Sequence, residues 1–411
     1  MKVLLVYPEF PDTFWSFKHA LPFQGKRSAY PPLGLLTVAA MLPARWQKRL
    51  VDMNVRRLKD SDLDWAEVVF FSGMMVQGPS MKQAIARSKQ RGRRTVVGGP
   101  IASAADPAIA EADHVVEGEA EELIAGLAAD LERGEARPHY KAPQLPDLTT
   151  VPLPDLRLSK LGNYSAMAVQ YSRGCPFTCE FCDIIEIYGR RPRTKTPEQI
   201  AAELDRVYQL GWRGPVFLVD DNFIGNKKNV RVLLPRLVEW MRDHKFPFSL
   251  FTEASVNLAE DEELLRLMRE AHFTRVFLGI ETPVEESLKE SLGSNTLLDL
   301  NFIPTMDAQE LIAGYRRILE TIYSPREYFE RAQAFLAQLG SSARAPIVFS
   351  DWMAVARSLW RQGLRSDYKK EYWKFIAQAA RRHRQHLDKA ITLAIMGHHF
   401  FELTWAGGSE T

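Results

Sequence analysis

The stretch R-G-C-P-F-T-C-E-F-C-D, from Arg173 to Asp183, holds all three cysteines of the 411-residue chain. They are Cys175, Cys179 and Cys182, with the spacing C-x3-C-x2-C. An odd number of thiols so close together excludes a disulfide framework. A structural zinc ion needs a fourth ligand, and no histidine lies at ligand spacing. A thiolate-bound iron–sulfur cluster with a chemical role is the better interpretation; the alternatives are a redox-inert cluster or three unrelated buried cysteines. Three thiolates on a four-iron cluster leave one iron open for chemistry.

The cysteine stretch lies at the start of a repeating βα pattern. A predicted strand, Met167 to Tyr171, leads directly into it. Further strands are predicted at 215–219, 248–252 and 275–279, and helices at 197–210, 228–244 and 261–271. Each repeat is roughly 30 to 35 residues long, which is typical of a parallel barrel or partial barrel. Residues 164–293 are therefore expected to form a parallel (βα) partial barrel.

Polar residues follow three successive strands of this predicted barrel. They are Asp220, Asp221 and Asn222, then Glu253 and Ser255, then Glu281. A single carboxylate at a strand end often caps the next helix, whereas three in succession indicate a lined pocket. The run Y-G-R-R-P-R, from Tyr188 to Arg193, adds arginines beside the cysteine stretch. These could neutralise a cluster or a carboxylate, or form a solvated basic loop.

Strands and helices also alternate in the N-terminal third. Strands are predicted at 3–7, 50–53, 68–72, 95–98 and 114–117, and helices at 33–42, 80–91, 107–111 and 119–133. This alternation predicts a doubly wound α/β domain over residues 1–135. Ligands of such sheets lie beyond the carboxyl ends of the strands. The candidate ligand-binding residues at these ends are Ser72, Gly73, Met74, Gly98, Gly99, Glu117 and Gly118. Small residues in tight turns are the alternative explanation.

A proline-rich stretch, residues 136–163, is interpreted as a linker between these two domains. From residue 294 to 411 the periodicity is helical, with helices predicted at 307–323, 325–340, 347–363, 367–385 and 387–405. The basic, aromatic stretch 365–384 fits a helix that packs its aromatic residues inward, with a membrane-surface helix as the alternative. The adjacent His398 and His399 cannot share one helix face, so we expect them to be structural.

Composition excludes some classes of function. Lys and Arg number 53 against 51 Asp and Glu, a net charge of +2, which gives no argument for nucleic acid as a partner. The start of the chain does not fit a signal peptide, and no run of about 18 apolar residues could span a bilayer. A cytoplasmic protein is expected, which suits thiolate ligands.

The cysteine motif, with the aromatic Phe181 before its third cysteine, closely resembles that of the radical S-adenosylmethionine (radical SAM) enzymes. The resemblance implies a [4Fe-4S] cluster on the three cysteines. It also implies S-adenosylmethionine (AdoMet) on the open iron, cleaved to a 5'-deoxyadenosyl radical by an electron from an external donor such as flavodoxin or ferredoxin. By the same resemblance, the D-D-N stretch would receive the AdoMet amino group, while Glu253, Ser255 and Glu281 would lie near its ribose.

Upstream of the motif, a first strand ending in Y-P, then P-P-L-G-L at Pro31 to Leu35, then G-G-P and E-G-E-A-E, follow in order. This order resembles the cobalamin-binding domain of the B12-dependent radical SAM class. The resemblance implies cobalamin at the strand ends named above. The D-x-H-x-x-G motif is absent, so no histidine of that motif can be the lower ligand of cobalt. A nucleotide or another planar cofactor is the alternative.

After Thr282 the radical SAM family would continue with two more βα units, some 60 residues that are missing here. The sequence from Met306 onward resembles the C-terminal region of the hopanoid methylase-like group, so the barrel is expected to be truncated by an internal deletion. These resemblances imply a cobalamin-dependent radical SAM enzyme, expected to be a methyltransferase that acts at an unactivated carbon. The substrate would be a small molecule or a lipid, the latter with peripheral membrane contact. Alternatives are a rearrangement or ring-forming enzyme, or a catalytically impaired homologue.

Overall fold

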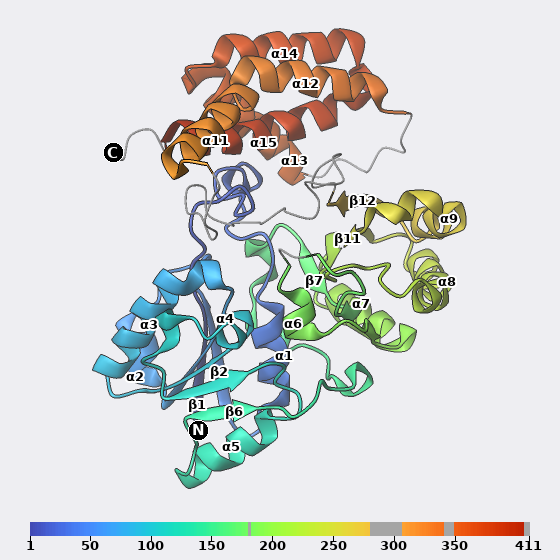
Figure 1. Ribbon diagram of the computed structural model, residues 1–411. Helices are drawn as coiled ribbons and strands as arrows, with labels where there is room; N and C mark the ends of the chain where they lie inside the picture. Colours follow the sequence, from blue (N-terminus) through green and yellow to red (C-terminus); the bar gives the residue numbers. More distant parts are fainter. Residues whose placement is uncertain (180–181, 280–305, 341–348, 407–411) are drawn as a thin grey trace. The chain divides into compact units, whose positions relative to one another are not determined.

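The computed structural model describes residues 1–179, 182–279, 306–340 and 349–406 (Figure 1). The chain divides into two compact units, Met1–Phe10 with Tyr30–Gly293 and Pro11–Ala29 with Ser294–Thr411. The first unit contains both parallel sheets, and the second is helical. The sequence did not predict that residues 11–29 would pack with the C-terminal helices.

The N-terminal part of the first unit is built on a six-stranded sheet in the order β2-β1-β3-β4-β5-β6. All its neighbouring strands are parallel. The strands are β1 (Lys2–Tyr7), β2 (Gln47–Asp52), β3 (Val68–Ser72), β4 (Arg94–Gly98), β5 (His114–Glu117) and β6 (His139–Lys141). The order of the first five is that of a flavodoxin-like sheet, whose ligand crevice lies between the first and third strands. This confirms the expected doubly wound fold.

Helices cover both faces of this sheet (Figure 1). On one face lie α1 (Leu33–Met41) and α5 (Ile124–Arg133); on the other lie α2 (Asp60–Trp65), α3 (Gly78–Gln90) and α4 (Pro100–Ser103). The short helices α2 and α4 were not predicted. The helix expected at 107–111 is one 3-10 turn, Pro107–Ile109. Helix α5 begins at Ile124 instead of residue 119, which leaves residues 119–123 as a loop.

Strand β6 corrects the interpretation of residues 136–163 as a plain linker. It pairs with β5 in parallel and so forms an edge of the six-stranded sheet. Tyr140, at its centre, is buried, and its hydroxyl donates a hydrogen bond to Asp130 of α5. A three-residue strand between prolines is too short to show a period of two, so the pattern gave no signal for it.

The cysteine-bearing part of the first unit has a four-stranded parallel sheet in the order β12-β11-β10-β7. The strands are β7 (Met167–Val169), β10 (Gly214–Leu218), β11 (Phe248–Ala254) and β12 (Phe273–Leu278). Helices α7 (Pro197–Gln209), α8 (Lys227–Asp243) and α9 (Glu262–Glu270) follow the first three strands and pack on one face. The expected βα pattern is confirmed over these strands.

Alternate residues of β11 face the two sides of this sheet. Leu250 and Ala254 lie in the core beneath the helices, while Phe251 and Glu253 are only partly buried on the other face. On that face the rings of Phe251 and Phe217 stack with centroids 4.8 Å apart, and the guanidinium of Arg275 lies 4.7 Å from the Phe251 ring. Aromatic rings therefore line the face of the four-stranded sheet that lies opposite helices α7, α8 and α9, next to the polar strand ends.

The cysteine loop leaves and rejoins the fold through a short antiparallel hairpin that was not predicted. Strand β8 (Ser172–Arg173) pairs with β9 (Arg193–Thr194), so that Arg173 lies opposite Arg193. Helix α6 (Ile184–Tyr188) lies between them. The loop is therefore closed at its base by two paired arginines.

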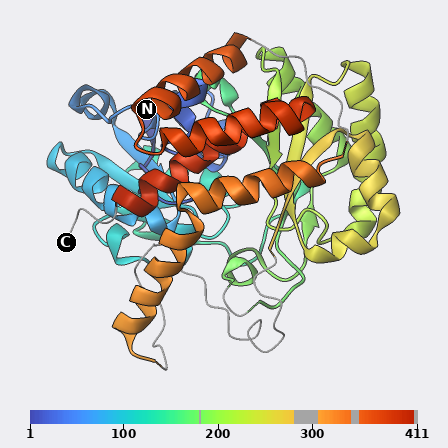
Figure 2. The same cartoon turned by 90° about the horizontal axis from the view of Figure 1, so that it is seen from above.

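The second unit has helices α11 (Ala308–Ile322), α12 (Pro325–Gln338), α13 (Phe349–Ser358), α14 (Lys369–Arg382) and α15 (Leu387–Ala406). Figure 2 shows these helices in orange to red. Side chains of α12, α14 and α15 share one aromatic core. Tyr372 and Phe375 of α14 are buried, which favours the inward-packing interpretation of the basic, aromatic stretch. None of the helices in the described ranges is both long and apolar enough to cross a lipid bilayer.

His399 of α15 is buried and the adjacent His398 is partly buried, and both are hydrogen-bonded, which fits a structural role. His399 Nε2 lies 3.2 Å from the carbonyl oxygen of Thr13 and 3.1 Å from that of Phe14, so it holds the segment 11–29. His398 Nδ1 lies 2.6 Å from the Tyr368 hydroxyl. Burial, with smaller contributions from neighbouring cations, lowers the pKa of His398 to about 4.

Candidate functional site

Asp220, the first residue of the D-D-N stretch, is a buried anchor. Its Oδ1 accepts a hydrogen bond from the backbone N–H of Tyr171 at 2.7 Å, and its Oδ2 accepts one from the Ser172 hydroxyl at 3.0 Å. The residue is 1% exposed, and burial raises its pKa to about 7. Both oxygens are thus directed at the chain that enters the cysteine loop. Asp220 therefore supports the backbone at the entry to the cysteine loop, and its oxygens do not face an open pocket.

Asp221 is the more accessible of the two aspartates. Its Oδ2 lies 3.3 Å from the backbone N–H of Gly174, just before the first cysteine. Burial raises its pKa to about 6. Burial and, second, the charge of Asp221 raise the pKa of Glu253. Two nearby carboxylates with raised pKa values favour a bound cation, because a positive group would relieve both desolvation and repulsion.

Asn222 and Ser255 connect the ends of β10 and β11 to the cysteine loop. Asn222 Nδ2 donates to Ser255 Oγ at 3.1 Å and lies 3.9 Å from the Sγ of Cys175. The Ser255 hydroxyl in turn donates to Asn257 at 2.7 Å. The structure therefore brings together four of the predicted residues, Asp221, Asn222, Glu253 and Ser255. Glu281, the last of the six residues predicted for the AdoMet pocket, lies outside the described residues.

Gly174 and Gly189 hold the base of the cysteine loop tight. Gly174 has φ +94°, and a Cβ there would meet the carbonyl oxygen of Gly189 at 2.7 Å and that of Tyr188 at 3.0 Å. The backbone N–H of Cys175 donates to the same Gly189 carbonyl at 3.3 Å. Only glycine suits this positive φ together with such close carbonyls. The local sequence R-G-C therefore starts the loop in one conformation.

The three thiols of the cysteine loop differ in exposure. Cys179 is exposed, and Cys175 and Cys182 are partly buried. Within the described ranges, no three His, Cys, Asp or Glu side chains converge as ligands of one metal ion. A cluster needs no such convergence, because each thiolate binds a different iron. Burial raises the pKa of the Cys182 thiol, a cost that bonding to iron as a thiolate would offset.

The predicted cobalamin residues lie at the carboxyl edge of the six-stranded sheet. Ser72 ends β3 and pairs in register with Gly98 of β4. Gly99 has φ +85°, and a Cβ on it would meet the Ser72 hydroxyl oxygen at 2.5 Å. The N–H of Ile101, in α4, donates to the carbonyl of Gly73 at 3.1 Å. The glycines thus keep two strand-end loops in backbone contact.

The rim of this edge fits a flat, largely apolar group. Met74 and Met75 are 46% and 43% exposed beside the β3 loop, although large apolar side chains are usually buried. The N–H of Gly118 donates to Ser103, which places the β5 loop beside α4. The loops after β3, β4 and β5 contain no histidine. A corrinoid held here would take no histidine ligand from those loops.

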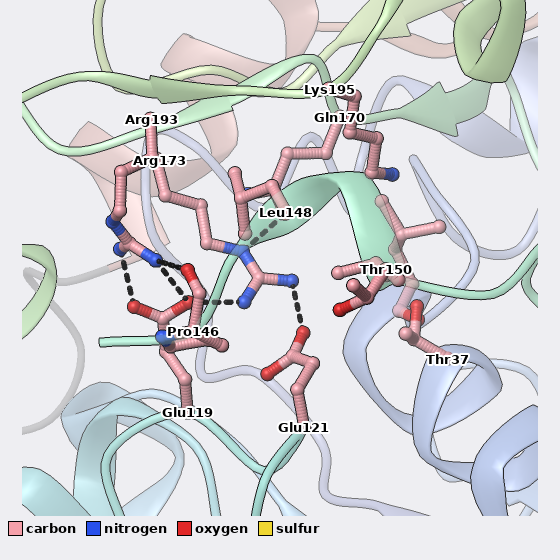
Figure 3. Close-up of polar contacts among 12 residues, drawn as sticks. Thr37, Glu119, Glu121, Pro146, Leu148, Thr150, Gln170, Arg173, Arg193 and Lys195 are labelled. Carbon is pink, nitrogen blue, oxygen red and sulfur yellow. Dashed lines mark hydrogen bonds and ion pairs between the residues drawn. The ribbon is translucent and has the colours of Figure 1, made fainter. Parts of the chain in front are cut away.

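Two acidic residues that sequence reasoning did not single out as partners join the two candidate sites (Figure 3). Glu119 accepts hydrogen bonds from Arg173 and Arg193, and Glu121 forms an ion pair with Arg173. Of the two alternatives for the arginine-rich run, Arg193 therefore fits the one that neutralises a carboxylate. The available signal was charge: E-G-E-A-E places acidic groups beyond a strand end, and arginines flank the cysteine stretch on both sides.

Comparison with protein families divides the chain in the same order as these sites. Residues 27–128 match the B12 binding domain, residues 169–331 match the radical SAM superfamily, and residues 284–407 match a domain of unknown function (DUF4070). Two solved structures share the fold. The radical AdoMet methyltransferase TsrM from Kitasatospora setae has a TM-score of 0.52 at 14% identity, over 82% of this chain and 71% of that one. The cobalamin-dependent AdoMet radical enzyme OxsB has a TM-score of 0.54 at 17% identity, over 70% of this chain and 45% of that one.

Relatives in sequence extend over most of the chain. An uncharacterized methyltransferase of Synechocystis sp. is 37% identical, over 98% of this chain and 92% of the relative. That alignment runs over 492 positions, more than the 411 residues present, so the relative has residues without a counterpart here. The hopanoid C-2 methylase of Rhodopseudomonas palustris is 40% identical over 76% of this chain, which spans 60% of that protein. The chain therefore belongs to the radical SAM superfamily, among the enzymes that also carry a B12-binding domain.

Proposed function

We propose that the chain is a cobalamin-dependent radical SAM methyltransferase that transfers a methyl group to an unactivated carbon of a small-molecule or lipid substrate. The observation that carries the proposal is the joining of the cysteine loop to a strand-end loop of a B12-binding sheet by direct ion pairs. The relatives named as methyltransferases support the same reaction class.

A [4Fe-4S] cluster, AdoMet and cobalamin are the cofactors of this family, and together they supply an electron, a hydrogen-abstracting radical and a methyl carrier. The residues of this chain would bind and orient them. Cys175, Cys179 and Cys182 are proposed as the cluster ligands. The two carboxylates Asp221 and Glu253 offer acceptors for the AdoMet amino group and ribose hydroxyls.

The remaining residues of the two proposed pockets have narrower roles. Asn222 and Ser255 hold the pocket edge against Cys175, and Asp220 fixes the backbone that leads into the loop. Ser72, Gly73, Met74, Gly98, Gly99, Glu117 and Gly118 are proposed to line the cobalamin edge. The chain is proposed to act in the cytoplasm, because thiolate ligands need a reducing compartment. An external donor such as flavodoxin or ferredoxin would supply the electron.

A ring-forming reaction is the second candidate. The anaerobic magnesium-protoporphyrin IX monomethyl ester cyclase of Cereibacter sphaeroides is 26% identical over 28% of this chain. Such a reaction consumes AdoMet without moving its methyl group. The two candidates therefore differ in the AdoMet products, even before the substrate is known.

The test is product analysis after anaerobic reconstitution with iron, sulfide and cobalamin, under reducing conditions. Methyl transfer predicts both 5'-deoxyadenosine and cobalamin-dependent release of S-adenosylhomocysteine. The triple variant Cys175→Ala, Cys179→Ala, Cys182→Ala is the control and should form no 5'-deoxyadenosine above background. Formation of 5'-deoxyadenosine with no S-adenosylhomocysteine would refute methyl transfer and favour the ring-forming candidate.

A further inference from the structure

Four charged side chains form a closed network between the two sheets of the first unit (Figure 3). Glu119 and Glu121 come from the loop between β5 and α5, and Arg173 and Arg193 come from the hairpin at the base of the cysteine loop. Their side chains are 2%, 8%, 12% and 19% exposed, in that order. Two carboxylates and two guanidinium groups balance in charge, as a buried network must.

Glu119 is the central residue of this network. Its Oε2 accepts from Arg173 Nη1 at 2.5 Å, and its Oε1 accepts from Arg193 Nη2 at 2.5 Å. Arg193 Nη1 also reaches Oε2, at 3.1 Å, so that this pair is bidentate. Glu121 Oε1 lies 2.8 Å from Arg173 Nη2. One carboxylate therefore binds both arginines, and the second carboxylate binds one of them.

Without these carboxylates, the positive charges of the two arginines would repel each other. Arg173 and Arg193 are direct partners across the β8–β9 ladder, and like charges at such positions repel each other. Glu119 lies against both guanidinium groups and removes that repulsion. The hairpin that begins and ends the cysteine loop is thus closed by a side chain from the six-stranded sheet.

We propose that Glu119 and Glu121 are positioning residues for the iron–sulfur cluster. They hold the base of the cysteine loop against the loop that ends β5. The half-barrel alone lacks this clamp, because the neutralising carboxylates come from the N-terminal sheet.

The clamp also connects the cluster to the cobalamin edge, an inference that rests on the proposed function. Glu119 is the second residue after Glu117, the end of β5, and the intervening Gly118 has φ +86°. One short loop therefore borders the proposed corrinoid and grips the cysteine hairpin. A ligand that orders this loop stabilises the conformation in which the β8–β9 hairpin is ion-paired to it. By thermodynamic reciprocity, an ordered hairpin increases the affinity for that ligand.

The experiment is hydrogen–deuterium exchange of residues 174–192 in the full-length, cluster-reconstituted protein. Glu119→Gln removes the charge that binds both arginines, and exchange of this loop should become about tenfold to a hundredfold faster, as expected for losing a hydrogen bond to a charged group. Glu121→Gln removes one ion pair and should give a smaller increase. Unchanged exchange in Glu119→Gln would overturn the clamp.

Tyr164→Phe is the matched control. The Tyr164 hydroxyl donates to Asp52 at 3.1 Å, a buried contact between the same two parts of the chain that does not involve the cysteine loop. This variant should leave exchange of residues 174–192 as in the wild type. Equal acceleration in Tyr164→Phe and Glu119→Gln would mean general loosening and would also overturn the proposal. If Glu119→Gln fails to fold, the single-contact variant Glu121→Gln decides the question.

A second arm adds hydroxocobalamin and repeats the exchange measurement. The wild type should show slower exchange of residues 174–192 with cobalamin, and Glu119→Gln should lose that response while cobalamin binding persists in its absorption spectrum. Binding without any response in the wild type would refute the coupling. Absence of cobalamin binding in the wild type would refute the proposed function but leave the first arm, and so the clamp, decided independently.

Discussion

Asp220→Asn should make the cofactor-free protein more stable at alkaline pH. Asp220 is buried, and its two oxygens accept hydrogen bonds from Tyr171 and Ser172. An asparagine keeps the acceptor for the Tyr171 N–H, and its amide can donate to the Ser172 hydroxyl oxygen. The substitution therefore removes a buried charge with little loss of hydrogen bonding.

The magnitude follows from the pKa of Asp220, which burial raises from 3.8 to about 7. Between these values the unfolded chain releases a proton that the folded chain keeps. The stability from this group is therefore complete below pH 3.8 and is lost as the pH rises through 7. At roughly 1.4 kcal/mol per pKa unit, the loss is about 4 kcal/mol at pH 8. Asparagine does not titrate, so the variant avoids it.

The assay is urea unfolding of wild type and variant at pH 5 and pH 8, followed by tryptophan fluorescence. The gain in unfolding free energy of Asp220→Asn over the wild type should be larger at pH 8 by about 2 to 3 kcal/mol, since part of the titration lies below pH 5. Asp243→Asn, an exposed carboxylate at the end of α8, is the control and should show no such difference. An equal effect of Asp220→Asn at both pH values would refute the reasoning.

Three further predictions concern the loop and the second unit. Asn222→Ala removes the N–H beside the Cys175 sulfur, so the reduction potential of the reconstituted cluster should fall in a redox titration; an unchanged potential would contradict this contact. Gly174→Ala should reduce bound iron after reconstitution, because its Cβ would lie 2.7 Å from a carbonyl oxygen, whereas Gly162→Ala, with open space around it, should bind iron normally. His398→Gln should gain stability relative to the wild type as the pH falls from 6.5 to 4, by up to about 3 kcal/mol, because the wild type keeps a largely desolvated neutral imidazole that protonates on unfolding. If the unfolding free energies of wild type and variant changed with pH in the same way, the lowered pKa of His398 would be refuted.

The sequence predicted elements correctly where a local pattern of residues has a single structural explanation. The strands β1, β3 and β10 are largely apolar runs, and the polar residues predicted at strand ends follow β10 and β11 directly in sequence. The prediction failed for β6, α2 and α4, which are three to six residues long. Elements this short show less than two helical turns or two alternations, so their periodicity cannot be distinguished from a loop.

The sequence by itself determined the order of the two α/β parts and the residues that end their strands, and it predicted the three cysteines as cluster ligands, because these features depend on local spacing. Only the tertiary structure decided which of those residues act together. It separated the buried Asp220 from the more accessible Asp221, since burial depends on the chain around Tyr171. It also brought Glu119 to Arg173 and Arg193, residues 54 and 74 positions away. Charges attract over space whatever their separation along the chain, so no local pattern could predict that pairing.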